Sequence, residues 1–135
     1  MNTAIFCYGT LQFPEVMERV TGRRFQGTRA MLDNFARYRI KNAVYPGVIA
    51  EHGAATEGIL YFDVDAESMH YLDIFEGTPY FRRQLPVRAS DGETVMAEVY
   101  VVDDQQRQTL TQERWDKQEF ARLHLQTYLA RIKPK

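Results

Sequence analysis

The chain has 135 residues, a length that suits one domain with a continuous core and room for a modest ligand cavity. Its 17 Lys and Arg residues nearly balance its 18 Asp and Glu residues, and the net charge of -1 excludes binding to nucleic acid or anionic membranes through a general positive field. The single Cys7 excludes an internal disulfide, the N-terminus lacks a signal peptide's apolar segment, and no apolar run reaches the roughly 20 residues of a membrane helix, so we expect a cytoplasmic protein.

The first two elements along the chain are a strand and a short helix. The strand is "TAIFCY" (3–8), which stops at Gly9, and the helix "PEVMERV" (14–20) starts with Pro14 and is followed by Gly22. Further β-like segments come next, each bounded by Gly, Pro, Asn or Asp. They are "FQGTRAMLD" (25–33), "ARYRIKN" (36–42), "PGVIA" (46–50) and "ATEGILYFDV" (55–64).

A second helix is predicted over 66–76, because Asp65 is a good N-cap and Gly77 ends it together with Pro79. Two more strands flank Ser90-Asp91-Gly92, where Asp-Gly tolerates the positive φ of a tight hairpin turn; they cover 80–89 and 94–102.

The last helix is expected from about 109 to 132, because one apolar stripe recurs there at helical spacing. The stripe consists of Leu125, Tyr128, Leu129 and Ile132. Taken together, the elements predict an α+β fold in which six or seven strands form a curled or closed, barrel-like sheet with a few helices packed around it.

Glu76 is the first candidate for chemistry. It shares a helix face with Leu72 and Met69, which we expect to be buried, and it lies in the last turn, at the negative end of the helix dipole. Burial, the dipole and repulsion from Asp73 would all raise the pKa of its carboxyl group, as a general acid/base requires. In the alternative interpretation Glu76 ends its helix at the rim and pairs with Arg82 or Arg83.

The segment "CYGTL" (7–11) is the second candidate. A strand that stops at Gly9 leaves backbone N–H groups without ladder partners, and such groups can bind a carboxylate or an oxyanion. The alternative is an ordinary turn. Tyr80 likewise could contact a ligand or fill a strand position.

Other chemistries lack support. Cys7 lies in an apolar run, which favours a buried, inert thiol. His52, His70 and His124 are far apart and none has a second ligand at metal-binding spacing, so no metal site is expected. The glycine-rich nucleotide-binding motifs do not occur.

Five motifs occur in a characteristic order: "YGTL" (8–11), "YPG" (45–47), "TEGILY" (56–61), "LDIFEGTPYFRRQLPV" (72–87) and "VYVV" (99–102). This order resembles the gamma-glutamylcyclotransferase-like superfamily, and most of all the branch of gamma-glutamylamine cyclotransferase and the plant avirulence-induced proteins. The Asp-x-x-Glu-Gly block followed by Tyr-x-Arg is the specific part. The resemblance implies one domain over residues 1–135, a small mixed barrel with a cavity at one end.

By position, the resemblance implies that Glu76 is the catalytic acid/base. The residues implied to bind the substrate are Tyr8, Gly9, Thr10, Leu11, Tyr80 and Arg82. In the family reaction the α-amine of a gamma-glutamyl group attacks its own side-chain amide, which gives 5-oxoproline and releases an amine or amino acid. This lyase-type intramolecular aminolysis needs no cofactor. The expected partner is a gamma-glutamyl small molecule, and the expected state is a monomer or weak homodimer.

Two alternatives stay open at this stage. The protein could be a non-catalytic binding or regulatory module that uses the same cavity, with Glu76 gripping an amine. It could also be an interaction protein whose cavity is closed. The sequence leaves open the leaving group of the substrate and which of Arg82 and Arg83 faces inward.

Overall fold

The computed structural model describes residues 2–77 and 79–134. The elements within these residues are β1 (Thr3–Cys7), η1 (Thr10–Gln12, a 3-10 helix), α1 (Pro14–Thr21), β2 (Gly27–Arg39), β3 (Pro46–Val64), α2 (Ala66–Glu76), β4 (Tyr80–Ala89), β5 (Thr94–Val102), η2 (Asp104–Thr109, also 3-10), α3 (Lys117–Leu123) and α4 (Leu125–Arg131).

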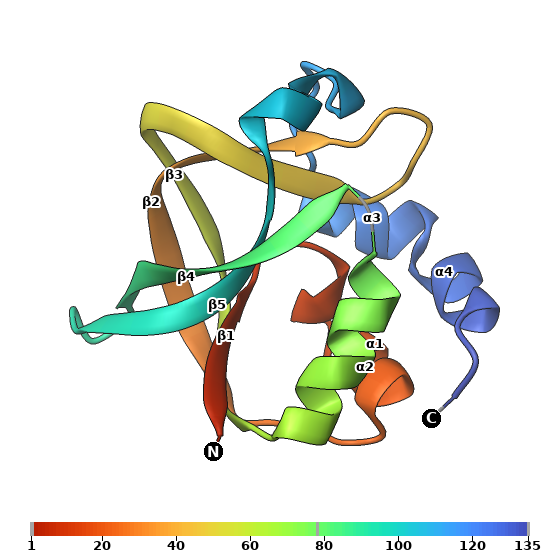
Figure 1. Cartoon of the computed structure of the whole chain (residues 1–135). Coiled ribbons are helices and arrows are strands. Elements are labelled where there is room, and N and C mark those ends of the chain that lie inside the picture. The colour runs from red at the N-terminus through yellow and green to blue at the C-terminus, as the bar shows by residue number, and fades with distance from the viewer. Residues whose placement is uncertain (1, 78, 135) are drawn as a thin grey trace.

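The strands close into a barrel in the order β1-β3-β2-β4-β5 (Figure 1). Neighbouring strands are antiparallel except β1 and β5, which run parallel and pair through Ile5 and Glu98. The sheet is therefore mixed, and the predicted α+β fold with a barrel-like sheet is confirmed. Closure gives each strand two neighbours, but two of the seams are short: β4 pairs with β2 only near Ala89, and β1 pairs with β5 only at Ile5.

The number of strands was predicted wrongly. Instead of four short strands, the chain between residues 27 and 64 forms the two long strands β2 and β3. Asn34 and Gly53 look like strand ends in the sequence, but the strand pairing continues past them through a bulge. Asn34, with a φ of 66°, lies opposite residues 51–54 of β3, and its Oδ1 accepts a hydrogen bond from the Gly53 N–H at 3.1 Å. A bulge bends and twists a strand without ending it, which is what a small closed barrel requires.

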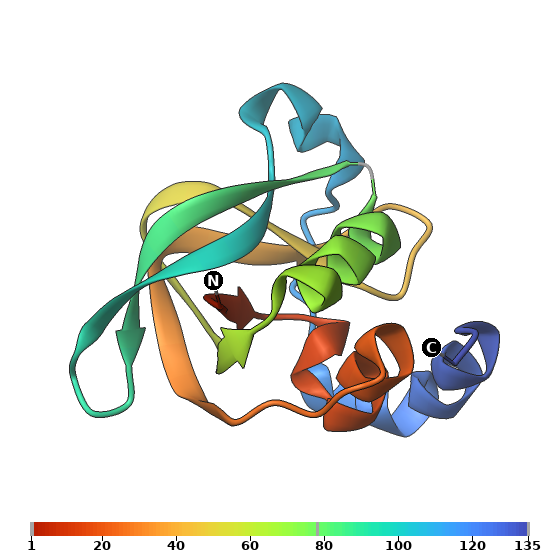
Figure 2. The same cartoon turned by 60° about the horizontal axis from the view of Figure 1, so that its bottom comes forward.

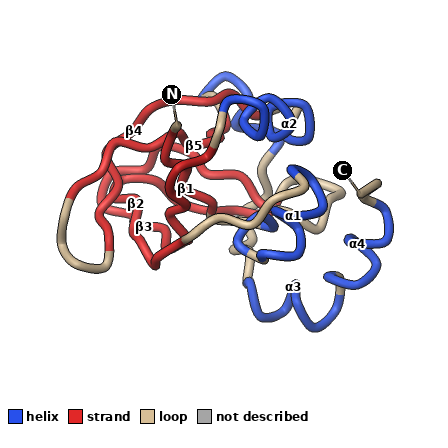
Figure 3. Tube along the Cα trace, turned by 90° about the horizontal axis from the view of Figure 1, so that it is seen from below, coloured by secondary structure: helices blue, strands red, loops and turns tan. Residues whose placement is uncertain are grey.

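Strand β1 separates two parts of the core. Phe6 belongs to a cluster formed by side chains of the strands, whereas Ile5 and Cys7 belong to a cluster shared with the helices. Successive residues of a strand point to opposite faces, so β1 is covered by the barrel interior on one face and by helices on the other. The helices gather on this one side of the barrel (Figures 2 and 3).

The predicted ends of α1 and α2 and the predicted hairpin are confirmed. Gly22 follows α1 with a φ of 79°, and the side chain of Asp65 accepts a hydrogen bond from the Ser68 N–H at the start of α2. Gly77 ends α2 with a φ of 58°, and Gly92 lies in the β4–β5 turn with a φ of 89°. Glu76 is thus held in the last turn of a helix with fixed ends.

The single C-terminal helix predicted from about 109 to 132 was wrong. Leu110 instead pairs with Ile40 in an isolated bridge, and α3 begins only after Asp116, whose side chain accepts hydrogen bonds from two backbone N–H groups. The chain bends at His124, which has a φ of -129°, and continues as α4. Among the described residues no helix is long and apolar enough to cross a membrane.

Candidate active site

A cavity of about 130 Å³ lies where β1 and α2 end and β4 begins. Its lining includes all predicted site residues except Arg82, namely Tyr8, Gly9, Thr10, Leu11, Glu76 and Tyr80. Predicted site residues from three separate segments of the sequence are thereby brought to one cavity. A purely structural interaction protein was expected to have no such cavity, whereas the structure has one lined by these residues.

Glu76 contributes an unpaired carboxyl group to this cavity. The residue is half-buried, and among the described residues its carboxyl group has no hydrogen-bond or ion-pair partner. Removing a carboxylate from water disfavours its charged form, and burial raises the pKa of Glu76 from 4.5 to about 8. The predicted direction of the pKa shift is confirmed, and the group can take or release a proton near neutral pH.

The cause of the shift differs from the prediction in one respect. Asp73 was expected to repel Glu76, yet burial alone accounts for the raised pKa. The carboxylate of Asp73 lies 3.0 Å from Nε of Arg82 and accepts a hydrogen bond from the Tyr100 hydroxyl at 2.7 Å. The positive charge of Arg82 therefore compensates the negative charge of Asp73 and weakens its repulsion of Glu76.

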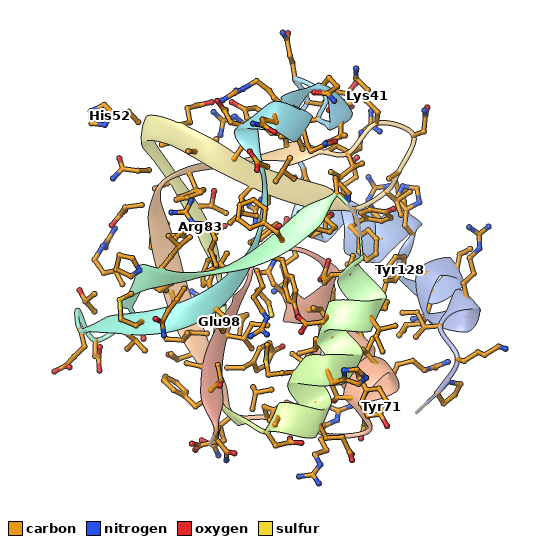
Figure 4. All side chains as sticks on the ribbon, viewed as in Figure 1. Lys41, His52, Tyr71, Arg83, Glu98 and Tyr128 are labelled. Atoms are coloured by element: carbon orange, nitrogen blue, oxygen red, sulfur yellow. The ribbon has the colours of Figure 1, made fainter. Side chains whose placement is uncertain are left out.

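Arg82 lies beside the cavity and not in its lining. Its guanidinium also pairs with Glu98 at 2.7 Å, and it lines a neighbouring groove that has Glu76, Tyr80 and Tyr100 in common with the cavity. Arg83, the other arginine considered, is exposed on β4 (Figure 4). Substrate binding by Arg82 stays a prediction. In the structure the Arg82 side chain contacts the acidic side chains of Asp73 and Glu98.

The loop after β1 brings backbone donors to the cavity. Residues 8–11 turn from β1 into η1, and the N–H groups of Gly9, Thr10 and Leu11 have no acceptor among the described residues. Adjacent free N–H groups of this kind suit a carboxylate or an oxyanion. The loop is tightly packed, because a Cβ atom on Gly9 would lie 3.0 Å from the ring of Pro46.

Tyrosine side chains make up much of the remaining wall and are braced by hydrogen bonds. The hydroxyl of Tyr8 donates to the carbonyl of Tyr100, and that of Tyr80 donates to the carbonyl of Pro46, each at 2.5 Å. Burial raises the pKa of the Tyr8 and Tyr80 phenols above the usual value, so both stay neutral.

Cys7 is excluded as a nucleophile by the same reasoning. Its thiol is buried, and burial raises its pKa well above 9.0. The described residues also contain no group of three His, Cys, Asp or Glu side chains that could hold a metal ion.

The sequence analysis missed part of the cavity wall. Tyr45, Pro46, Phe75, Tyr100 and Tyr128 line it but were not singled out as site residues. Tyr128 comes from α4, and its hydroxyl lies 3.2 Å from Oγ1 of Thr10 (Figure 4). The available signal was its hydroxyl within an otherwise apolar helical stripe, because a buried Tyr needs a hydrogen-bond partner.

The chain is similar in sequence to known proteins. The profile of the protein family described as "Gamma-glutamyl cyclotransferase, AIG2-like" matches residues 5–117. AIG2-like protein D of Arabidopsis thaliana is 29% identical over 132 residues, which cover 96% of this chain and 86% of that protein.

Solved structures share the fold. A protein of Arabidopsis thaliana with a known solution structure has a TM-score of 0.75 at 24% identity, with 98% of this chain and 95% of that chain covered. A structure named gamma-glutamyl cyclotransferase has a TM-score of 0.66 at 16% identity, with 100% and 90% covered. At these identities the similarity shows a common fold.

Proposed function

This chain belongs to the gamma-glutamyl cyclotransferase, AIG2-like family, and from this premise we propose that it converts a gamma-glutamyl compound into 5-oxoproline and a free amine or amino acid. The observation that carries the proposal is the half-buried, unpaired carboxyl group of Glu76, which lines the same cavity as the free N–H groups of residues 9–11. The first is a proton carrier and the second is an anion site.

The first step activates the attacking nitrogen. The α-amine of a gamma-glutamyl group is an ammonium ion near neutral pH and has no lone pair for attack. The carboxylate of Glu76 removes one proton, and the free amine then attacks the carbonyl carbon of the side-chain amide. With a pKa of about 8, Glu76 is a much stronger base than an ordinary glutamate, although a smaller fraction of it is ionised at pH 7.

The second step releases the leaving group. As the new C–N bond closes the five-membered lactam, the old C–N bond breaks and the departing nitrogen takes up a proton from Glu76. Over one cycle two protons leave the attacking nitrogen and two reach the departing one. One carboxyl group can carry both in turn, because a pKa of about 8 makes uptake and release similarly easy.

The loop of residues 8–11 has a binding and electrostatic role in this proposal. Its free N–H groups can donate to the α-carboxylate of the substrate or to the oxygen of the tetrahedral intermediate. Holding the glutamyl chain folded brings its amine close to its own amide, and such proximity lowers the barrier by several kcal/mol. The rigid, neutral tyrosines would keep water out and fix the shape of the site.

Incubation with a panel of gamma-glutamyl amines, gamma-glutamyl amino acids and glutathione tests the proposal, with 5-oxoproline as the readout. We expect 5-oxoproline from at least one class, and the class identifies the leaving group. Saturable binding of a gamma-glutamyl compound without product over long incubation would instead support the non-catalytic binding module.

A further inference from the structure

A second hollow lies outside the barrel. It is a groove of about 800 Å³ between β2 and β3 on one side and the segment that leads into α3 on the other. None of its described lining residues lines the Glu76 cavity. Both hollows adjoin the same stretch of chain, because residues 8–11 line the cavity and the next residue, Gln12, lines the groove.

Gln12 carries an unsatisfied donor at this groove. Its side chain belongs to a residue that is only 6% exposed, and its Nε2 atom, which is shielded from solvent, has no hydrogen-bond partner among the described residues. Buried polar groups in native proteins are nearly always hydrogen-bonded, so an orphan donor calls for an explanation. A molecule bound in the adjoining groove would supply the missing acceptor.

Arg37 supplies further donors at the same place. Its guanidinium is partly buried, lies over the ring of Trp115 at 5.4 Å, and donates through one terminal nitrogen to the carbonyls of Tyr8 at 2.7 Å and Glu57 at 3.1 Å. No described carboxylate forms an ion pair with it. Glu57 and Asp116 act on its charge without a direct ion pair. A half-buried cation with spare N–H groups and no paired carboxylate favours an anion from outside.

The rest of the groove has a positive excess. Asp116 is already occupied as the N-cap of α3, and Arg88 is paired with Asp33 at 3.0 Å. Apart from Arg88, the basic side chains of the lining are Arg29, Arg37, Arg114 and Lys117, against the carboxylates of Glu57 and Asp116. Basic side chains around a concave surface raise the local concentration of anions.

We propose that this groove binds a small molecule with a carboxylate or phosphate group, which accepts hydrogen bonds from the spare N–H groups of Arg37 and, once the Gln12 side chain turns toward the groove, from its Nε2. Because Arg37 also donates to the carbonyl of Tyr8, it links the bound anion to the loop that lines the cavity. The site does not depend on the turnover proposed above, since binding can be measured without any gamma-glutamyl substrate.

Trp115 is the single tryptophan of the chain and lines the groove, so its fluorescence reports directly on binding. Inorganic phosphate and malonate are titrated separately at constant ionic strength, with sodium chloride as the reference salt. We expect a saturable change in emission with at least one anion, and the effective anion identifies the phosphate or the carboxylate class. Two equal titrations would mean that the site accepts both.

Two variants test the residues, and a third serves as the control. Affinity is expected to fall at least tenfold in Arg37→Gln and in Gln12→Met, which keeps the length of the side chain but removes the donor. It is expected to stay within twofold in Arg24→Gln, which loses the same charge at an exposed arginine paired with Glu18 away from the groove.

The proposal also predicts a stability readout. The anion should raise the melting temperature of the wild-type protein and not that of Gln12→Met, which decides the question if Arg37→Gln fails to fold. The absence of a saturable response to both anions, or equal affinities in the wild type and Gln12→Met, would overturn the proposal.

Discussion

Replacing Glu76 with Gln should change how the stability of the protein depends on pH, and the raised pKa of Glu76 gives the size of the change. Burial raises the pKa of this carboxyl group from 4.5 to about 8 in the folded chain. Between these pH values the folded state holds a proton that the unfolded state releases. The contribution of the protonated group to stability is therefore fully present below about pH 4.5 and is lost as the pH rises through about 8.

The size of this loss follows from the shift. The interval from 4.5 to about 8, at about 1.4 kcal/mol per pKa unit, corresponds to about 5 kcal/mol. Because Glu76 as a whole is only half-buried, solvent screens part of the effect, and we expect about 3–5 kcal/mol. That is a large share of the ~5–15 kcal/mol by which domains are stable. A glutamine side chain has nearly the same shape and no charge, so Glu76→Gln should escape this loss.

Urea unfolding at intervals from about pH 5 to about pH 9 measures the difference. The free energy of unfolding of the wild-type protein should fall by about 3–5 kcal/mol more than that of Glu76→Gln. Glu67→Gln, an exposed glutamate in the first turn of the same helix, is the matched control and should follow the wild-type curve. Parallel curves for the wild type and Glu76→Gln would refute the reasoning, because the carboxyl group would then titrate as an exposed one does.

The remaining predictions concern catalysis and are checked by steady-state kinetics with 5-oxoproline as the readout. The value of kcat/KM should rise tenfold per pH unit up to about pH 8 and level off, since Glu76 must be ionised to act as a base; a flat profile from about pH 6 to 9 would contradict this. Arg82→Gln leaves Asp73 uncompensated, so the midpoint of the profile should move to higher pH, whereas Arg83→Gln should leave it in place. Gly9→Ala should lower kcat/KM at least tenfold, because the added Cβ atom would lie 3.0 Å from Pro46 and displace the loop. Thr10→Val loses only the 3.2 Å contact to the Tyr128 hydroxyl and should lower kcat/KM about threefold. Equal losses in the two variants would count against a role for the backbone of the loop.

The local parts of the fold could be predicted because their signals are local. Asp65 and Gly77 bound α2 through a cap and a positive φ, and both preferences are intrinsic to the residue. The bulge at Asn34 could not be predicted in the same way. An Asn with positive φ ends a strand in one context and bends it in another, and only the closure of the barrel decides between them.

The candidate site shows the same division. The position of Glu76 on an apolar helix face already predicted a carboxyl group with a raised pKa. Its relation to Asp73 could not be predicted, because Asp73 lies on α2 and its partner Arg82 lies on β4. The place of Tyr128 in the cavity wall could not be predicted for a similar reason, since its contact with Thr10 spans 118 residues of sequence and depends on how α4 docks.

The most direct test of the central claim is single-turnover release of 5-oxoproline from the gamma-glutamyl substrate that the panel identifies, measured for the wild type, Glu76→Gln and Glu67→Gln. Glu76→Gln should keep its fold and bind the substrate yet lose at least a thousandfold in rate, consistent with the ~10²–10⁴-fold contribution of acid–base groups, while Glu67→Gln keeps the wild-type rate. Equal rates for Glu76→Gln and the wild type would contradict the assignment of Glu76 as the proton carrier.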